Sequence, residues 1–212
     1  MAVYFILWSW LAWGSLNKYQ KFVLPSAILL WLVYTIFIGL RVEIGADWEV
    51  YLIYLDYQVD MPITHPFTLA EPGYQFANWI AVKMGWGIFG ANTICGGIFT
   101  ACLMRYCSSM PYPWLGMALA YPYLTIVVAM GYTRQAVAIG FILLALRALE
   151  NSNIRNSLFW VLIASSFHES ALVMLILPFL NLGKLGRTKN LLRLTLLCGI
   201  VYGLYRTLIS VV

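Results

Sequence analysis

The sequence has little charge of either sign. Only 10% of its 212 residues are charged, against roughly 25% in an ordinary soluble domain, while 62% are hydrophobic and the mean hydropathy is +0.82. A chain so poor in charge cannot cover the surface of a soluble domain, and the composition predicts an integral membrane protein. Neither an internal repeat nor a linker divides the chain. We therefore expect a single membrane domain over residues 1–212.

Cysteine and histidine are also scarce. The four cysteines follow no metal-binding spacing and lie in or beside apolar segments, where cysteine behaves as a small apolar residue. The sequence therefore predicts neither a disulfide nor a metal site, and it carries no motif for a cofactor. Asp47 together with Glu43 could hold a metal, but no other feature of the sequence requires one.

The net charge of +5 does not indicate nucleic-acid binding. The basic residues are dispersed among the loops between apolar segments instead of gathering on one soluble face, so we expect no nucleic-acid partner. They indicate topology instead, because basic residues favour cytoplasmic loops. If the chain begins outside the cytoplasm, five of these side chains are cytoplasmic: Lys18, Lys21, Arg105, Arg147 and Arg155.

Apolar segments recur along the chain. A membrane-spanning helix needs about 20 apolar residues. Seven candidates, two of them short, lie near residues 2–16, 22–40, 85–104, 112–130, 135–149, 157–180 and 190–211. We therefore expect an all-α, polytopic membrane protein of about seven transmembrane or partly re-entrant helices. The first segment lacks a basic start and a clear cleavage site, so we treat it as a retained helix and not as a signal peptide.

One loop, residues 184–193, disagrees with this topology. It carries four basic residues and no acid, yet it would lie outside. The segment before it, residues 157–180, has His168 at its centre. A single span followed by an unusual loop is the simpler interpretation, because it needs no buried irregular backbone. The alternative is a re-entrant pair of half-helices with His168 near the tip.

The acidic residues are concentrated in one insert. Six of the eight lie in residues 41–83, between the second and third expected spans, and the topology places this insert on the outer, extracytoplasmic face. A helix over residues 47–57 would bring four side chains to one face: Asp47, Tyr51, Tyr54 and Gln58. That face fits either a helix lying at the membrane interface or a surface that receives sugars or lipid head groups. Further along the insert, His65 lies in a proline-rich turn, where we expect it to be simply exposed.

Ionisable side chains at membrane depth are costly unless they are paired or hydrated. Arg41 ends the second expected span, Arg134 opens the fifth and His168 interrupts the sixth. Each arginine alone could be a helix-end side chain that reaches the interface. All three together, beside the acidic insert, favour a functional cluster, since arginine binds phosphate through paired hydrogen bonds and histidine moves protons near neutral pH.

Four ordered motifs contain these residues. They are Arg41-x3-Gly45-x-Asp47-x3-Tyr51, Glu71-x-Gly73-Tyr74, Thr133-Arg134-Gln135-x2-Ala138 and Ala164-x2-Phe167-His168-x-Ser170-Ala171-Leu172. In this order they resemble the EpsG family of bacterial polysaccharide polymerases, which is grouped with the Wzy-type O-antigen polymerases. The resemblance covers residues 38–179. Where the family commonly has proline after the histidine, this sequence has Glu169, and family members usually continue for several spans past the position of Val212.

The resemblance implies a glycosyltransferase that makes an exopolysaccharide or O-antigen on the outer face of the bacterial cytoplasmic membrane. A glycan carried on undecaprenyl pyrophosphate would be moved onto a sugar hydroxyl of another lipid-linked repeat unit. The implied partners are this lipid-linked oligosaccharide and membrane lipid, with a flippase or a chain-length regulator as a protein partner.

The resemblance also implies roles for the motif residues. Arg41 and Arg134 would stabilise the lipid pyrophosphate as it leaves. Asp47, Glu71 and His168 compete as the base for the acceptor hydroxyl, with Asp47 or His168 preferred and Glu71 orienting a sugar hydroxyl. The substrate-binding set would be Tyr51, Glu71, Tyr74, Gln135 and Ser170, with the two tyrosines as walls of the sugar site.

Two other classes of function stay open. A transporter or flippase component, or a truncated regulator of a polymerase, would bind lipid-linked glycan without turnover. A multispan acyltransferase with His168 as its base is the weaker alternative. The sequence offers this histidine no acidic partner except Glu169, and adjacent helix positions point about 100° apart.

Overall fold

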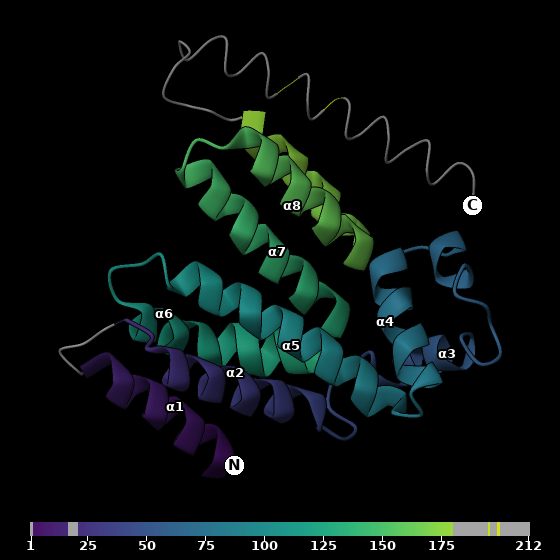
Figure 1. The fold of residues 1–212 in the computed structure, drawn as a ribbon, viewed down its shortest axis with the longest axis horizontal. Coiled ribbons are helices and arrows are strands. Elements are labelled where there is room, and N and C mark those ends of the chain that lie inside the picture. Colours follow the sequence, from purple (N-terminus) through teal and green to yellow (C-terminus); the bar gives the residue numbers. More distant parts are fainter. Residues whose placement is uncertain (1, 17–20, 180–194, 196–198, 200–212) are drawn as a thin grey trace.

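The computed structural model describes residues 2–16, 21–179, 195 and 199, and in these ranges every regular element is helical (Figure 1). The all-α prediction is therefore confirmed for the described part of the chain. The elements, in order, are α1 (Ala2–Leu16), α2 (Leu24–Gly39), α3 (Trp48–Asp56), η1 (His65–Thr68), α4 (Pro72–Lys83), α5 (Gly87–Cys107), α6 (Pro113–Ala120), the π-helix η2 (Tyr121–Ala129), α7 (Thr133–Glu150), α8 (Ile154–Phe167) and η3 (Glu169–Phe179).

Helix α5 is the centre of the fold. It packs against α2 on one side and α7 on the other, and α7 in turn packs against α8 (Figure 1). Two clusters of buried apolar side chains share α5. One joins its second half to α1, α2 and α6, and the other joins its first half to α3, α4, α7 and α8. Close packing through both halves of one helix fixes α4 and α7 relative to each other.

Helix α5 is also the one described helix that is long and apolar enough to cross a membrane. Four shorter apolar helices are Ala2–Leu16, Leu24–Gly39, Pro113–Ala129 and Ile154–Phe167. Seven spans therefore stay a prediction. The expected last span, 190–211, and the basic loop, 184–193, lie outside the described residues except for positions 195 and 199.

Residues 157–180 do not form one continuous helix. Helix α8 ends at Phe167, the backbone of His168 is extended with φ −156° and ψ 121°, and η3 begins at Glu169. η3 then runs back beside α8 (Figure 1). The single span that the sequence favoured is thus wrong, and the alternative of two half-helices with His168 at the tip describes this backbone. The break is stabilised by a carboxylate from elsewhere in the chain, because the N–H of Glu169 donates to Glu71 Oε1 at 3.4 Å.

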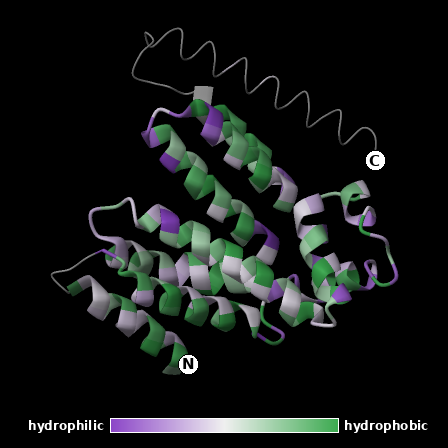
Figure 2. Ribbon diagram, viewed as in Figure 1, coloured by the Kyte–Doolittle hydropathy of each residue, from purple (hydrophilic) through white to green (hydrophobic). Residues whose placement is uncertain are grey.

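The acidic insert, residues 41–83, folds against one end of the bundle as α3, η1 and α4 (Figure 1). Hydrophilic residues gather in its loop and at helix ends, while α1 and α2 are largely hydrophobic (Figure 2). Helix α3 packs against α4 and α5, and the polar side turns inward, since Tyr51 on α3 and Gln58 in the turn after it are fully buried. The sequence predicted that face correctly but could not tell what would cover it.

Candidate active site

Glu71 is the point at which three distant segments meet. Its Oε2 accepts a hydrogen bond from Arg134 Nη1 at 2.7 Å, and its Oε1 lies 2.6 Å from His168 Nδ1. The side chain is only 9% exposed. A charged carboxylate can stay in such a place because both of its oxygens have partners. One buried carboxylate therefore holds a guanidinium and an imidazole close together.

The backbone of Glu71 is unusual. It has φ 56° and ψ 55°, the left-handed conformation, and it directly precedes Pro72 at the start of α4. For a non-glycine residue this conformation costs on the order of 1–3 kcal/mol, and strain of this kind is often found at functional sites. Proline is favoured at the first position of a helix, and α4 accordingly begins at Pro72, directly after Glu71. This helix start places the Glu71 carboxylate just before the first turn of α4, where it faces His168 and Glu169 between α8 and η3.

Gly73 lets α4 approach α8. A Cβ atom at this position would lie 2.6 Å from Ser166 Oγ and 2.8 Å from Phe167 Cε2, closer than real contacts allow. Any larger residue would push the start of α4 away from the end of α8. The glycine of the second motif is thus explained by packing, and this packing brings Glu71 to His168.

Arg134 stands near the start of α7, with three tyrosine rings around its guanidinium. Its Cζ lies 5.2 Å from the ring centre of Tyr54, 5.7 Å from that of Tyr51 and 5.9 Å from that of Tyr74. Such cation–π contacts hold an arginine in place without neutralising it. Its Nη1 also donates to the Tyr54 hydroxyl at 3.4 Å.

Asp47 provides a second, looser carboxylate for Arg134. Its Oδ2 lies 3.7 Å from Arg134 Nη2 and accepts a hydrogen bond from the Tyr51 hydroxyl at 3.3 Å. The Asp47 side chain is 30% exposed, so this ion pair is weaker than the one that Arg134 makes with Glu71. The fold thus brings together four residues of the motifs, Asp47, Glu71, Arg134 and His168, of which the sequence had predicted a cluster of Arg134 and His168 with Arg41 beside the acidic insert.

Tyr51 and Tyr74 lie beneath Arg134 and not at the surface. Their exposed fractions are 1% and 0%, which corrects the expectation that they form the walls of a sugar site. Burial raises the pKa of Tyr51, with the charge of Asp47 adding to the rise, and burial raises the pKa of Tyr74 as well. Both phenols therefore stay neutral at physiological pH, and both rings support the guanidinium from below.

Arg41 is not part of the surface cluster. It is 3% exposed, and its guanidinium donates to the carbonyl oxygens of Ile38 and Ala129 at 3.2 and 3.3 Å. It also donates to Asn92 Oδ1 at 3.0 Å and to Thr133 Oγ1. Arg41 thus ties the ends of α2 and η2 to α5 and to the first residue of α7. The expectation that it contacts a leaving group directly does not fit this burial, whereas a role in positioning Arg134 does.

Gly45 fixes the backbone at the start of the insert against the turn that precedes α7. Its φ is +109°, and a Cβ atom there would lie 2.5 Å from the carbonyl oxygen of Gly131. Glycine is the residue that tolerates this φ and this contact. The first motif therefore places Asp47 beside the turn that leads into α7.

The remaining predicted residues are more peripheral. Gln135 and Ser170 are exposed, and neither makes a side-chain hydrogen bond within the described part of the chain. His168, for which the sequence offered only Glu169 as an acidic partner, is instead paired with Glu71. That correction removes the reason given above for ranking acyl transfer low. Among the described residues, no group of three or more histidine, cysteine, aspartate or glutamate side chains could hold a metal ion.

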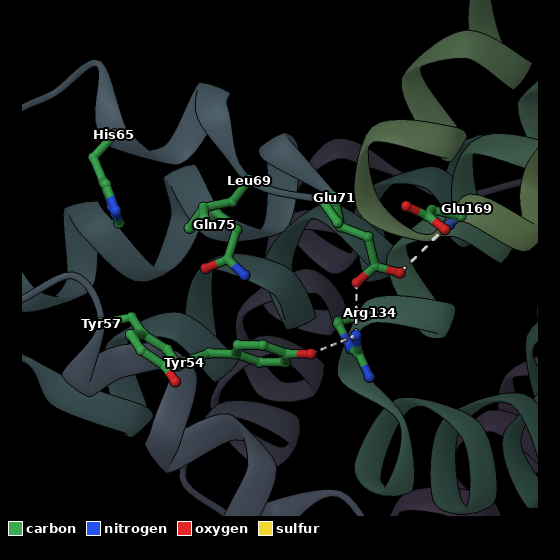
Figure 3. Close-up of a pocket in the computed structure, with 9 residues that line it drawn as sticks. Tyr54, Tyr57, His65, Leu69, Glu71, Gln75, Arg134 and Glu169 are labelled. Atoms are coloured by element: carbon green, nitrogen blue, oxygen red, sulfur yellow. Dashed lines mark hydrogen bonds and ion pairs between the residues drawn. The ribbon is translucent and has the colours of Figure 1, made fainter. Parts of the chain in front are cut away.

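A pocket of about 550 Å³ opens beside the cluster (Figure 3). Its volume is in the usual range for small-molecule sites. Nine residues line it: Tyr54, Tyr57, His65, Leu69, Ala70, Glu71, Gln75, Arg134 and Glu169. Sequence reasoning did not select Tyr57, His65 or Gln75 for the site. The one available signal was that Gln75 follows Glu71 by four positions, which puts both on one face at the start of a helix.

Comparison with known proteins assigns a family to this chain. The EpsG family matches residues 25–212, a range that includes all four motifs. Neither the comparison with curated proteins nor that with solved structures finds a match.

Proposed function

This chain belongs to the EpsG family, and on that premise we propose that it is a glycosyltransferase that polymerises a polysaccharide at the membrane. EpsG family proteins are membrane polymerases. The donor in this proposal is a glycan on undecaprenyl pyrophosphate, and the acceptor is a sugar hydroxyl of a second lipid-linked repeat unit. The reaction would take place on the outer face of the bacterial cytoplasmic membrane, where the insert and the pocket would lie in a multi-pass topology.

One observation carries the proposal: the Glu71 carboxylate binds both Arg134 and His168 at the edge of a pocket. An ionised carboxylate only accepts hydrogen bonds, so the Nδ1 atom of His168 carries a proton. In the neutral imidazole the other nitrogen, Nε2, is then free to accept one. The His168 side chain is 23% exposed, which leaves it within reach of a substrate. This arrangement suits a general base oriented by a carboxylate.

The bond changes follow from these positions. The acceptor hydroxyl gives its proton to His168 Nε2 while its oxygen bonds to the anomeric carbon of the donor. The bond between that carbon and the pyrophosphate oxygen breaks, and the lipid pyrophosphate leaves with the electron pair. Arg134, 18% exposed, is the cation that would stabilise the negative charge on this leaving group. Glu71 and the tyrosine rings hold both groups in place before substrate arrives.

The geometry favours His168 over Asp47 as the base. Asp47 Oδ2 already faces the Arg134 guanidinium and accepts a hydrogen bond from the Tyr51 hydroxyl, so this oxygen is occupied before substrate arrives. We assign Asp47 to holding Arg134 and Arg41 to positioning the start of α7. Glu71 orients His168.

Acyl transfer is a second candidate, because the His168–Glu71 pair would serve a base in that reaction equally well. Arg134 distinguishes the two. Acyl transfer from a neutral ester develops charge on one oxygen, which neutral donors can stabilise, whereas a departing pyrophosphate carries charge on several oxygens that a guanidinium binds through paired hydrogen bonds. Loss of an acyl modification, with polysaccharide length unchanged, would support acyl transfer and overturn the polymerase proposal.

The test in cells is complementation of a deletion strain. We expect wild-type protein to restore long-chain polysaccharide on a gel, and His168→Gln and Arg134→Gln to leave only single repeat units at normal protein levels. Arg155→Gln, an exposed arginine on α8, is the matched control and should restore the full ladder. A full ladder from both His168→Gln and Arg134→Gln would contradict the proposal.

A further inference from the structure

The pocket has two chemically different ends (Figure 3). Glu71, Arg134 and Glu169 form a charged end, and the proposed reaction uses Glu71 and Arg134. Four residues without a fixed charge form the other: Tyr54, Tyr57, His65 and Gln75. This second group, called the neutral end below, comes entirely from the insert, and of its members only Tyr54 contacts Arg134.

A buried glutamine organises the neutral end. Gln58 has an exposed fraction of 0%, and its Nε2 donates to Gln75 Oε1 at 2.9 Å. Its Oε1 lies 3.2 Å from His65 Nδ1. Because the amide nitrogen of Gln58 serves Gln75, its oxygen is the atom that faces His65, and an amide oxygen can only accept. His65 Nδ1 therefore carries a proton, and His65 is not the merely exposed side chain that the sequence suggested.

These contacts leave one hydrogen-bond donor, Gln75 Nε2, and one acceptor, His65 Nε2, available to a ligand. Gln75 uses its Oε1 toward Gln58, and within the described part of the chain its Nε2 makes no hydrogen bond. Neutral His65, protonated on Nδ1, keeps Nε2 as an acceptor. Gln75 itself is 5% exposed, so its donor is held rigidly at the pocket wall. Gln58, which is fully buried and out of reach of a ligand, orients both Gln75 and His65.

Sugar hydroxyls match this arrangement. Neighbouring hydroxyls on a pyranose ring each donate and accept, so one of them can accept from Gln75 and the other can donate to His65. The half-buried Tyr54 and exposed Tyr57 add ring faces and hydroxyls to the same wall. A phosphate would find no fixed cation here, which separates this end from the guanidinium end.

We propose that the neutral end is a pyranose subsite, in which Gln75 and His65 bind hydroxyls of a sugar ring and Gln58 orients both. This inference rests on the proposed function, since it assigns the sugar of a repeat unit to one end of the pocket and the pyrophosphate to the other. Gln75 and His65 would thereby select which sugar is accepted. Gln58 is a positioning residue.

The experiment measures binding of simple sugars to the purified full chain in lipid nanodiscs. The probes are the methyl pyranosides of glucose, galactose, N-acetylglucosamine and N-acetylgalactosamine, followed by saturation-transfer NMR. We expect at least one to bind, and Gln75→Met to weaken that binding about tenfold, the equivalent of one lost hydrogen bond. Arg155→Gln should leave the same binding within about twofold, because Arg155 is exposed on α8 and does not line the pocket. Absence of binding by all four probes would overturn the inference, as would unchanged binding in Gln75→Met.

A second variant separates ligand binding from a structural role. In His65→Asn, the side-chain amide nitrogen can replace Nδ1 and keep the bond to Gln58, but the Nε2 acceptor is lost. We expect a melting temperature close to wild type together with weakened pyranoside binding. Wild-type binding in His65→Asn would show that the network only holds the insert together, and the subsite would be wrong.

The two proposals can fail separately. If the polymerase proposal is wrong and the subsite is right, wild-type protein binds a pyranoside but elongates no lipid-linked repeat unit. If only the subsite is wrong, wild-type protein elongates repeat units, and Gln75→Met and His65→Asn do so with an unchanged KM for the acceptor.

Discussion

Glu71 Oε1 lies 2.6 Å from His168 Nδ1, although the two residues are 97 positions apart in the chain. The contact joins the residue that precedes α4 to the tip between α8 and η3. It also explains why the sixth apolar segment is broken, because the polar tip has a buried carboxylate to bind. Four measurements test the structure of the site around this contact.

The first concerns the packing that creates this contact. Gly73→Ala would place a methyl group 2.6 Å from Ser166 Oγ, and such overpacking costs typically 1–3 kcal/mol. We expect lower thermal stability and a large loss of polymer, since α4 must move away from α8. Gly131→Ala is the matched control, because a Cβ there meets nothing within 4 Å. Wild-type activity in Gly73→Ala would show that the spacing between α4 and α8 does not matter.

The second concerns Arg41. Replacing it with Gln removes hydrogen bonds to two carbonyl oxygens and leaves buried acceptors without partners, at about 1–3 kcal/mol for each. We expect Arg41→Gln to lower the melting temperature and the polymer yield together. Arg134→Gln should remove activity with a smaller loss of stability. A stable but inactive Arg41→Gln protein would instead support direct contact with the leaving group.

The sequence predicted a good part of this site and could not have predicted the rest. Composition indicated helices, and the four motifs identified Asp47, Glu71, Arg134 and His168, which the fold does bring together. Helical spacing placed Tyr51 on a polar face but could not show that α4 would cover it. The sequence pattern around each residue could not show that Glu71 contacts His168, because that contact depends on how α4 packs against α8.

The third prediction separates the two candidate bases. Asp47 is partly exposed and 3.7 Å from Arg134, so Asp47→Asn should change stability by less than about 1 kcal/mol. We expect this variant to retain polymerisation at a reduced rate, while His168→Gln loses it. Rates are compared with purified protein and lipid-linked repeat units. If Asp47→Asn is inactive and His168→Gln is active, Asp47 is the base.

The fourth prediction concerns alkaline pH. Burial raises the pKa of Tyr51 and Tyr74 above the value near 10 that tyrosine has in an unfolded chain. The unfolded state therefore loses these protons first, so stability is complete below about pH 10 and falls as the pH rises above it. Tyr51→Phe should make that fall shallower in thermal melts recorded from neutral to strongly alkaline pH. An identical slope in wild type and variant would mean that Tyr51 does not contribute.

The most direct test of the central claim is elongation of purified lipid-linked repeat units by protein in nanodiscs, with Glu71→Gln compared with Glu49→Gln. Both variants replace a carboxylate by an amide of the same shape, but Glu49 is exposed on α3 and outside the cluster. An oriented general base contributes roughly 10²–10⁴-fold to a rate. We therefore predict that Glu71→Gln elongates at least about 100-fold more slowly than Glu49→Gln, which should match wild type. Equal elongation rates for the two variants would contradict the account.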